Sequence, residues 1–223
     1  MTGVQTCALP IFGFNMDSAY AQKLQAVFTH RTFYSPESGP YTETYLSVNG
    51  RSVKYAPVSE GQFRGALEIE LKFTDSNGKV AHNDRYNLLS PEVSDTNKID
   101  FSFLDQQRIS LPNGTYKMEM RVTDKNNSTG SSTINETVQM DYQPGILSIS
   151  DIELVDSFSP SKETSSITKS GYDVVPYADN FYPASMNTLR FYAEVYNSDK
   201  ILDQSGYLLT FRLETAETKN ILD

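Results

Sequence analysis

The two histidines, His30 and His82, are the first residues to consider for metal or acid–base chemistry. They fall in two different expected strands, beside Arg31 and Asn83. A zinc site takes three or four ligands at recognisable spacing, and neither histidine has such neighbours in the sequence. We therefore interpret both as histidines at the surface or at a strand rim.

Catalysis by a serine needs a base and an orienting acid, usually with the serine at a strained turn such as G-x-S-x-G. That motif is absent from the sequence. Two carboxylates brought together by a fold can hydrolyse a glycosidic bond, but nearly all carboxylates here lie on polar strand faces or in turns. We predict that this chain is not an enzyme, with no catalytic residue and no cofactor.

Calcium is the metal for which the sequence offers most oxygen ligands. Asp95, Asn97 and Asp100 lie in one expected loop, and Asp75 and Asn77 in another. Neither loop carries the full twelve-residue ligand pattern with its closing Glu. Asx side chains also fix the backbone of turns without any ion. We favour this second interpretation and predict no metal site.

Aromatic side chains are dense in the last third of the chain. A partner-binding patch there would contain Tyr177, Phe181, Tyr182, Tyr192 and Tyr196. A sugar-binding platform is an alternative, although such platforms more often include Trp, which is absent. The interpretation we favour is that half of the rings face a core and half cover an outer face. The five residues remain the candidate interaction surface.

The elements that position these residues alternate apolar and polar side chains. From Leu67 to Phe73 every second residue is apolar, and Glu or Lys stands between them; residues 116–122 and 189–196 alternate similarly. Antiparallel strands with one buried and one solvated face have this pattern. No stretch of comparable length has the helical period, so the sequence predicts an all-β fold.

Turn residues divide residues 22–143 into seven or eight expected strands. Asn49-Gly50 predicts a two-residue hairpin, because both residues tolerate positive φ. Residues 75–78, Asp-Ser-Asn-Gly, predict another turn. Short strands at this spacing are typical of an immunoglobulin-like antiparallel β-sandwich.

Residues 143–145, Gln-Pro-Gly, interrupt this pattern, and residues 146–223 start a new series of strands. We predict a second immunoglobulin-like sandwich there, and an incomplete one, because such a sandwich usually needs about 100 residues. A phase shift between Ile149 and Ile152 predicts a bulge. We expect Leu209, Phe211 and Leu213 to be poorly covered, and the chain to bind hydrophobic dye or aggregate.

The N-terminal segment differs from the rest. Residues 1–11, which include Cys7, resemble a translated sequencing-library adapter over ten positions, so we expect them to be an artefact. Residues 12–21 are interpreted as the remnant of a signal peptide. Ala19-Tyr20-Ala21 has the small residues that signal peptidase accepts, which predicts cleavage before Gln22 and export.

The overall charge bears on the class of partner. A formal net charge of -9 without basic clusters argues against binding to nucleic acid or to an anionic membrane surface. No apolar run approaches the roughly 20 residues that span a bilayer. The expected partner is an unknown envelope protein or a downstream domain of the same chain; a glycan is the less supported alternative.

Several segments resemble a known group of proteins. DIELVDSFS, VVPYADNFYP and LRFYAEVYN, together with YLSVNGRSVKY, YNLLSPEVSDT and SLPNGTYKMEMRVTDKN, resemble the N-terminal region of exported bacterial proteins that carry a GWxTD-motif domain. The resemblance covers most of residues 22–213 and rests on packing and turn residues. The GWxTD motif itself is absent from the sequence. The resemblance implies β-rich domains and export to the envelope, and no defined activity.

Together these observations predict a non-catalytic exported module, periplasmic or at the cell surface or secreted, for protein interaction or domain spacing. The alternative is the accessory N-terminal part of a secreted enzyme, or a glycan-binding module, with catalysis in a missing C-terminal domain.

Overall fold

The computed structural model describes four stretches of the chain: residues 23–127, 130–179, 181–202 and 206–214. The interpretations of residues 1–11 and 12–21, and the cleavage before Gln22, lie outside these stretches. The described residues are mostly antiparallel strands. Regular helix among them is limited to α1 (Ser198–Ile201) and the 3-10 turn η1 (Gly50–Ser52), which confirms the all-β prediction.

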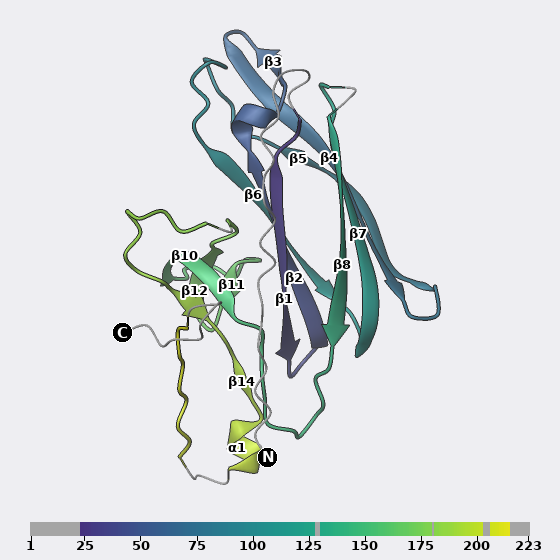
Figure 1. The fold of residues 1–223 in the computed structure, drawn as a ribbon, viewed down its shortest axis with the longest axis vertical. Coiled ribbons are helices and arrows are strands. Elements are labelled where there is room, and N and C mark those ends of the chain that lie inside the picture. The colour runs from purple at the N-terminus through teal and green to yellow at the C-terminus, as the bar shows by residue number, and fades with distance from the viewer. Residues whose placement is uncertain (1–22, 128–129, 180, 203–205, 215–223) are drawn as a thin grey trace.

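The first eight strands form two facing antiparallel sheets (Figure 1). One sheet has the order β1-β2-β6. In the other, β4 pairs with β3, β5 and β7, and β8 lies outside β7. This is a β-sandwich; its immunoglobulin-like character stays a prediction. The strands are β1 (Ala26–Ser35), β2 (Gly39–Asn49), β3 (Tyr55–Ser59), β4 (Gln62–Asp75), β5 (Val80–Leu89), β6 (Ser102–Ser110), β7 (Gly114–Asp124) and β8 (Ser131–Met140).

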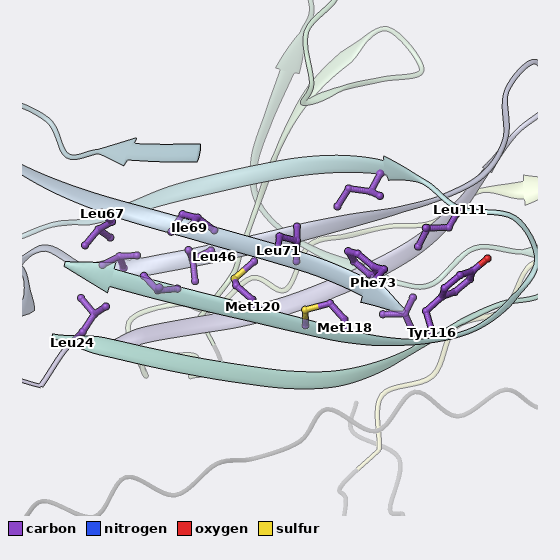
Figure 2. Packing of buried hydrophobic residues seen from close by; sticks show 14 of the residues in the cluster. Leu24, Leu46, Leu67, Ile69, Leu71, Phe73, Leu111, Tyr116, Met118 and Met120 are labelled. Carbon is purple, nitrogen blue, oxygen red and sulfur yellow. The ribbon is translucent and has the colours of Figure 1, made fainter. Parts of the chain in front are cut away.

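The core of the sandwich lies where the alternation predicted it. The apolar residues of β4 from Leu67 to Phe73 are each at most 1 % exposed. Met118 and Met120 of β7 pack with them, and Leu46 of β2 faces them from the other sheet (Figure 2). Burying both sheets' apolar faces against each other is the main stabilising contribution to such a fold.

The hairpin predicted at Asn49-Gly50 is wrong. β2 pairs with β1 and β6 while β3 pairs with β4, so this segment crosses from one sheet to the other. Asn49 caps η1, because its side chain accepts from the Arg51 backbone N. Gly50 N donates to Phe101 O at 3.0 Å, and a Cβ at Gly50 would lie 2.8 Å from that oxygen. Glycine is required here because Phe101 approaches its backbone closely, and not because the turn needs a positive φ.

The turn predicted over residues 75–78 is confirmed between β4 and β5. Gly78 has a φ of 81°, which glycine adopts without steric cost. The Asp75 carboxylate accepts from the backbone N of Asn77 and of Lys79, both at 2.9 Å. An Asx side chain therefore holds this turn, as expected from the sequence.

The described residues from Ile146 to Glu214, here called the second part, have much shorter strands. Its strands form the sheets β11-β12-β10-β13 and β14-β9. They are β9 (Ser148–Ile149), β10 (Glu153–Pro160), β11 (Thr168–Lys169), β12 (Tyr172–Pro176), β13 (Phe191–Tyr192) and β14 (Val195–Tyr196). Whether the second part is an independent domain stays a prediction.

The bulge predicted between Ile149 and Ile152 is instead a break between β9 and β10. Ser150 N donates to Glu194 O at 2.9 Å, and Asp151 N donates to Thr32 O of β1 at 3.1 Å. The shift in register lies further on, between Val155 and Ser157. The strand is interrupted because Asp151 pairs with the first sandwich.

The second part lies against the outer face of the β1-β2-β6 sheet (Figure 1). As a result β2 is buried on both faces, and every residue from Tyr41 to Val48 is buried. The sequence of this strand suggests a solvated face that includes Glu43. The structure places that carboxylate at 0 % exposure instead.

Candidate functional site

The contact between the second part and the β1-β2-β6 sheet, here called the seam, begins along the free edge of β1. Asp151 Oδ2 accepts from Thr32 N at 2.7 Å and from Thr32 Oγ1 at 2.8 Å. Further along, Tyr34 N donates to the Tyr196 hydroxyl at 3.0 Å. An edge strand with unpaired backbone groups is a site for unwanted pairing, and the second part covers this one.

Three tyrosines continue the seam. The rings of Tyr34, Tyr142 and Tyr196 contact one another with centroids 5.6 to 6.0 Å apart. The Tyr142 hydroxyl donates to Thr32 O at 2.7 Å, and the Tyr196 hydroxyl donates to Glu194 Oε2 at 2.6 Å. Burial raises the pKa of both hydroxyls above the ordinary tyrosine value, so they stay protonated donors.

Four charged residues meet at the centre of the seam and form the ion-pair cluster: Glu43, Arg108, Glu153 and Lys169. Arg108 donates to Glu43 Oε1 twice, from Nε at 2.9 Å and from Nη2 at 2.7 Å. Lys169 Nζ lies 2.6 Å from Glu43 Oε2 and also pairs with Glu153 Oε2. The cluster thus joins β2 and β6 of the first sandwich to β10 and β11.

Aromatic rings close the cluster off. Lys169 Nζ lies 4.0 Å from the ring centre of Phe33 and 5.3 Å from that of Tyr192, and its side chain is 1 % exposed. The Tyr45 hydroxyl donates to Glu43 Oε2 at 2.5 Å. Cation–π contact and charge-assisted hydrogen bonds replace the water that a lysine normally keeps.

The two carboxylates of the cluster have unequal surroundings. Glu43 accepts from Arg108, Lys169 and Tyr45, whereas Glu153 Oε1 has no hydrogen-bond partner among the described residues. Burial raises the pKa of Glu153, although Lys169 opposes this. Leaving a buried oxygen unpaired costs about 1–3 kcal/mol, and more if the group is charged.

An aromatic pocket of about 200 Å³ lies on the second part, beside the cluster. Phe158 and Tyr172 meet edge to face on its wall, with ring centres 6.1 Å apart. Lys169 and Tyr192 belong both to this pocket and to the surroundings of the cluster. The pocket is lined by Val155, Phe158, Lys169, Tyr172, Val174, Arg190, Phe191 and Tyr192.

The five aromatic residues predicted as an interaction surface occupy three places. Tyr177 and Tyr182 pack together with ring centres 4.4 Å apart, and the Tyr177 hydroxyl donates to the carbonyl oxygen of Phe181, a residue that is 70 % exposed. Tyr192 lines the aromatic pocket, and Tyr196 is buried in the seam. Their role in partner binding stays a prediction.

Exposed apolar side chains are concentrated in the second part. Among the described residues, eighteen large apolar side chains are exposed, and fifteen of them belong to the second part. Leu209, Phe211 and Leu213 are among them, as predicted, and Phe211 is 81 % exposed. Phe211 meets Phe191 at the pocket, with ring centres 5.5 Å apart.

The histidines stand apart from each other, in β1 and β5. Burial, with a smaller effect of Arg31, lowers the pKa of His30. The ring of His82 meets Phe73 edge to face at 6.0 Å. The described stretches contain no group of three or more His, Cys, Asp or Glu side chains arranged to hold a metal ion.

The carboxylates that were considered as calcium ligands have partners within the chain. Asp95 accepts from the backbone N of Asn97 at 2.9 Å and pairs with Lys98 at 3.4 Å. Asp100 pairs with Arg51 at 2.6 Å. These carboxylates fix local backbone geometry or balance a neighbouring cation.

Sequence reasoning missed the cluster and most of the pocket. Lys169 stands in a segment rich in Ser, Thr and Lys, and Glu43 alternates with Thr as on a solvated face. The one available signal was two adjacent aromatic residues, Phe191 and Tyr192, of which the prediction retained only Tyr192.

Comparison with known proteins gives no relative. No family model matches the chain, and no curated protein or solved structure matches it. The resemblance to the N-terminal region of GWxTD-domain proteins therefore stays a prediction. Within the described residues, no helix has both the length and the apolar character to cross a membrane.

Proposed function

We propose that this chain is a non-catalytic, exported β-sandwich module whose second part binds a segment of another polypeptide at the aromatic pocket. The observation that carries this proposal is the concentration of exposed apolar side chains in the second part, of which Phe158, Tyr172 and Phe191 line that pocket. Monomeric proteins seldom expose large contiguous apolar patches except where they bind something.

The shape of the pocket favours a polypeptide over a sugar. Its volume of about 200 Å³ suits one or two apolar side chains. Its rings meet edge to face, at 69° for Phe158 with Tyr172 and 65° for Phe191 with Phe211. A sugar ring stacks on an exposed aromatic face, whereas Phe158, Tyr172 and Phe191 form the walls of a recess.

The seam supports a spacing role for the same module. Hydrogen bonds along β1 and the buried ion-pair cluster hold the second part in one orientation on the first sandwich. A pocket on a fixed support loses less conformational entropy on binding than one on a free linker. The accessory-enzyme alternative stays a second prediction, without a specific observation in its favour.

The test is binding of alternating apolar peptides to the full chain, followed by NMR of the labelled protein. We expect resonance shifts at Phe158 and Phe191, and loss of binding in Phe191→Ser. Val80→Ser is the matched control, because Val80 is exposed on the first sandwich. The proposal would be overturned if Phe191→Ser left peptide binding unchanged. It would also be overturned if the chain bound glycans on an array but bound none of the peptides.

Export is tested separately, on the protein from its own cells. We expect it in the envelope or the medium with Gln22 as its first residue, by cell fractionation and N-terminal sequencing. Cytoplasmic protein that retains residues 12–21 would contradict export and would leave the peptide-binding proposal unaffected.

A further inference from the structure

The ion-pair cluster has the parts needed to make a covalent bond. We propose that Lys169 and Glu153 condense to an intramolecular isopeptide bond, with Glu43 as the group that moves the proton. This inference concerns a modification site and is independent of the peptide-binding proposal.

The reacting groups are already in contact and rigidly held. Lys169 Nζ lies within hydrogen-bond distance of Glu153 Oε2, and both side chains are 1 % exposed. Lys169 pairs with Tyr172 across a tight turn in which Ser170 and Gly171 have positive φ. Glu153 pairs with Tyr192 in β13. Fixing an amine beside a carboxyl makes their reaction effectively unimolecular, which is equivalent to a very high local concentration.

The surroundings assign different roles to the two carboxylates. Glu43 accepts two hydrogen bonds from Arg108 and one from Tyr45, which fix its carboxylate 2.6 Å from Lys169 Nζ, in position to exchange a proton with it. Glu153 Oε2 accepts from Lys169, and its Oε1 has no hydrogen-bond partner among the described residues. Its burial favours the neutral acid, which is the form that an amine attacks.

The step balances without any other reactant. Glu43 takes a proton from the Lys169 ammonium, and the free Nζ attacks Cδ of the protonated Glu153 carboxyl. The Nζ–Cδ bond forms, and Glu43 gives its proton to the departing hydroxyl, which leaves as water when the Cδ–O bond breaks. Glu43 then takes the second proton from the nitrogen and releases it to solvent, so that a neutral amide, water and the Glu43 carboxylate result. Nothing is oxidised or reduced.

The amide product leaves less unbalanced charge buried in the site than the two separate side chains do. The amide is neutral, so a buried ammonium and a titrating carboxyl disappear, while Glu43 and Arg108 remain as a balanced pair. The rings of Phe33 and Tyr192 next to Nζ exclude water, which shields the amide bond from hydrolysis.

The decisive measurement is mass spectrometry of the full chain under denaturing conditions. We expect a mass lower than that of the sequence by one water, and a branched tryptic peptide that joins Lys169 to Glu153. A mass equal to that of the sequence would overturn the proposal, as would a water loss that persists in Lys169→Ala.

Two controls make the result specific. Glu43→Gln keeps both reacting groups but lacks the proton acceptor, and we expect it to show the full, unreduced mass; water loss in this variant would overturn the role of Glu43. Lys72 and Glu119 form an exposed pair at 3.7 Å within the same chain, and their peptides should stay unlinked. A branch between those two residues would show that proximity alone produces the bond.

Discussion

The first sandwich and the second part follow the same alternation of apolar and polar residues with different results. Strands of the first sandwich run for 5 to 14 residues and enclose one continuous core. Strands of the second part run for 2 to 8 residues, and most of its large apolar side chains are exposed. Alternation builds a core only where two sheets are long enough to cover each other.

The two regions also place their charges differently. The first sandwich keeps cross-strand pairs such as Arg85–Glu70 and Lys72–Glu119 on its surface, where each contributes little. The second part buries Lys169 against Glu43 and Glu153. It is therefore fixed by polar contacts at the seam more than by a core of its own.

The largest expected effect is on the core of the first sandwich. Phe73→Ala should lower the free energy of unfolding by about 4 kcal/mol, because a fully buried ring leaves a cavity. Phe158→Ala in the second part should cost less than about 1 kcal/mol, because that ring is exposed. Guanidinium denaturation measures both; equal losses would mean that the two regions do not differ as described.

The next effect is at the seam. Lys169→Met leaves the buried Glu43 and Glu153 carboxyl groups without their partner and should cost about 3 kcal/mol. Amide hydrogen exchange should speed up in β10 and β12 and stay unchanged in β4. The matched control is Lys72→Met, which removes the exposed Lys72–Glu119 ion pair. We expect it to lower the free energy of unfolding by less than about 0.5 kcal/mol. Uniform exchange across both regions would argue against a local role.

A smaller effect separates two similar tyrosine hydrogen bonds. The hydroxyl of Tyr142, whose ring contacts Tyr196 in the seam, donates to Thr32 O, and that of Tyr116 donates to Pro112 O away from the seam. Replacing either with Phe should cost about 1 kcal/mol. Only Tyr142→Phe should accelerate exchange in the second part, and the reverse result would place the seam elsewhere.

The pH dependence should report on His30 in β1. Its pKa lies below the ordinary 6.5, so the unfolded chain binds more protons than the folded one as the pH falls through 6.5. The free energy of unfolding should therefore decrease with falling pH in that range. His30→Gln should flatten the slope between about pH 7 and 5, and urea titrations at several pH values would show it. Identical slopes would contradict the burial of a neutral imidazole.

The smallest stability effect is expected at the exposed apolar surface. Phe211→Ser should leave the free energy of unfolding within about 0.5 kcal/mol of the original. It should nevertheless reduce binding of a hydrophobic dye, because Phe211 is 81 % exposed beside Phe191. A monomeric chain that binds no dye before the substitution would refute the expectation of a poorly covered second part.

The sequence by itself determined the strand class and the core face of the long strands. From Leu67 to Phe73 the buried set follows from alternation, because side chains on one strand point to opposite faces whatever the strand packs against. The Asp75 turn also followed from the sequence, since its hydrogen bonds are made within five residues. These are local properties.

Only the tertiary structure decided what covers the other face. Glu43 is buried because a segment more than a hundred residues later lies over it, and its pairing with Lys169 has no local signature. Glycine is required at position 50, where the chain crosses between sheets, because Phe101 approaches its backbone. Tyr192 and Tyr196 separate because β13 and β14 pair with different strands. Alternation states which side chains share a face, whereas contacts between distant segments decide whether that face meets water, a core or a charge.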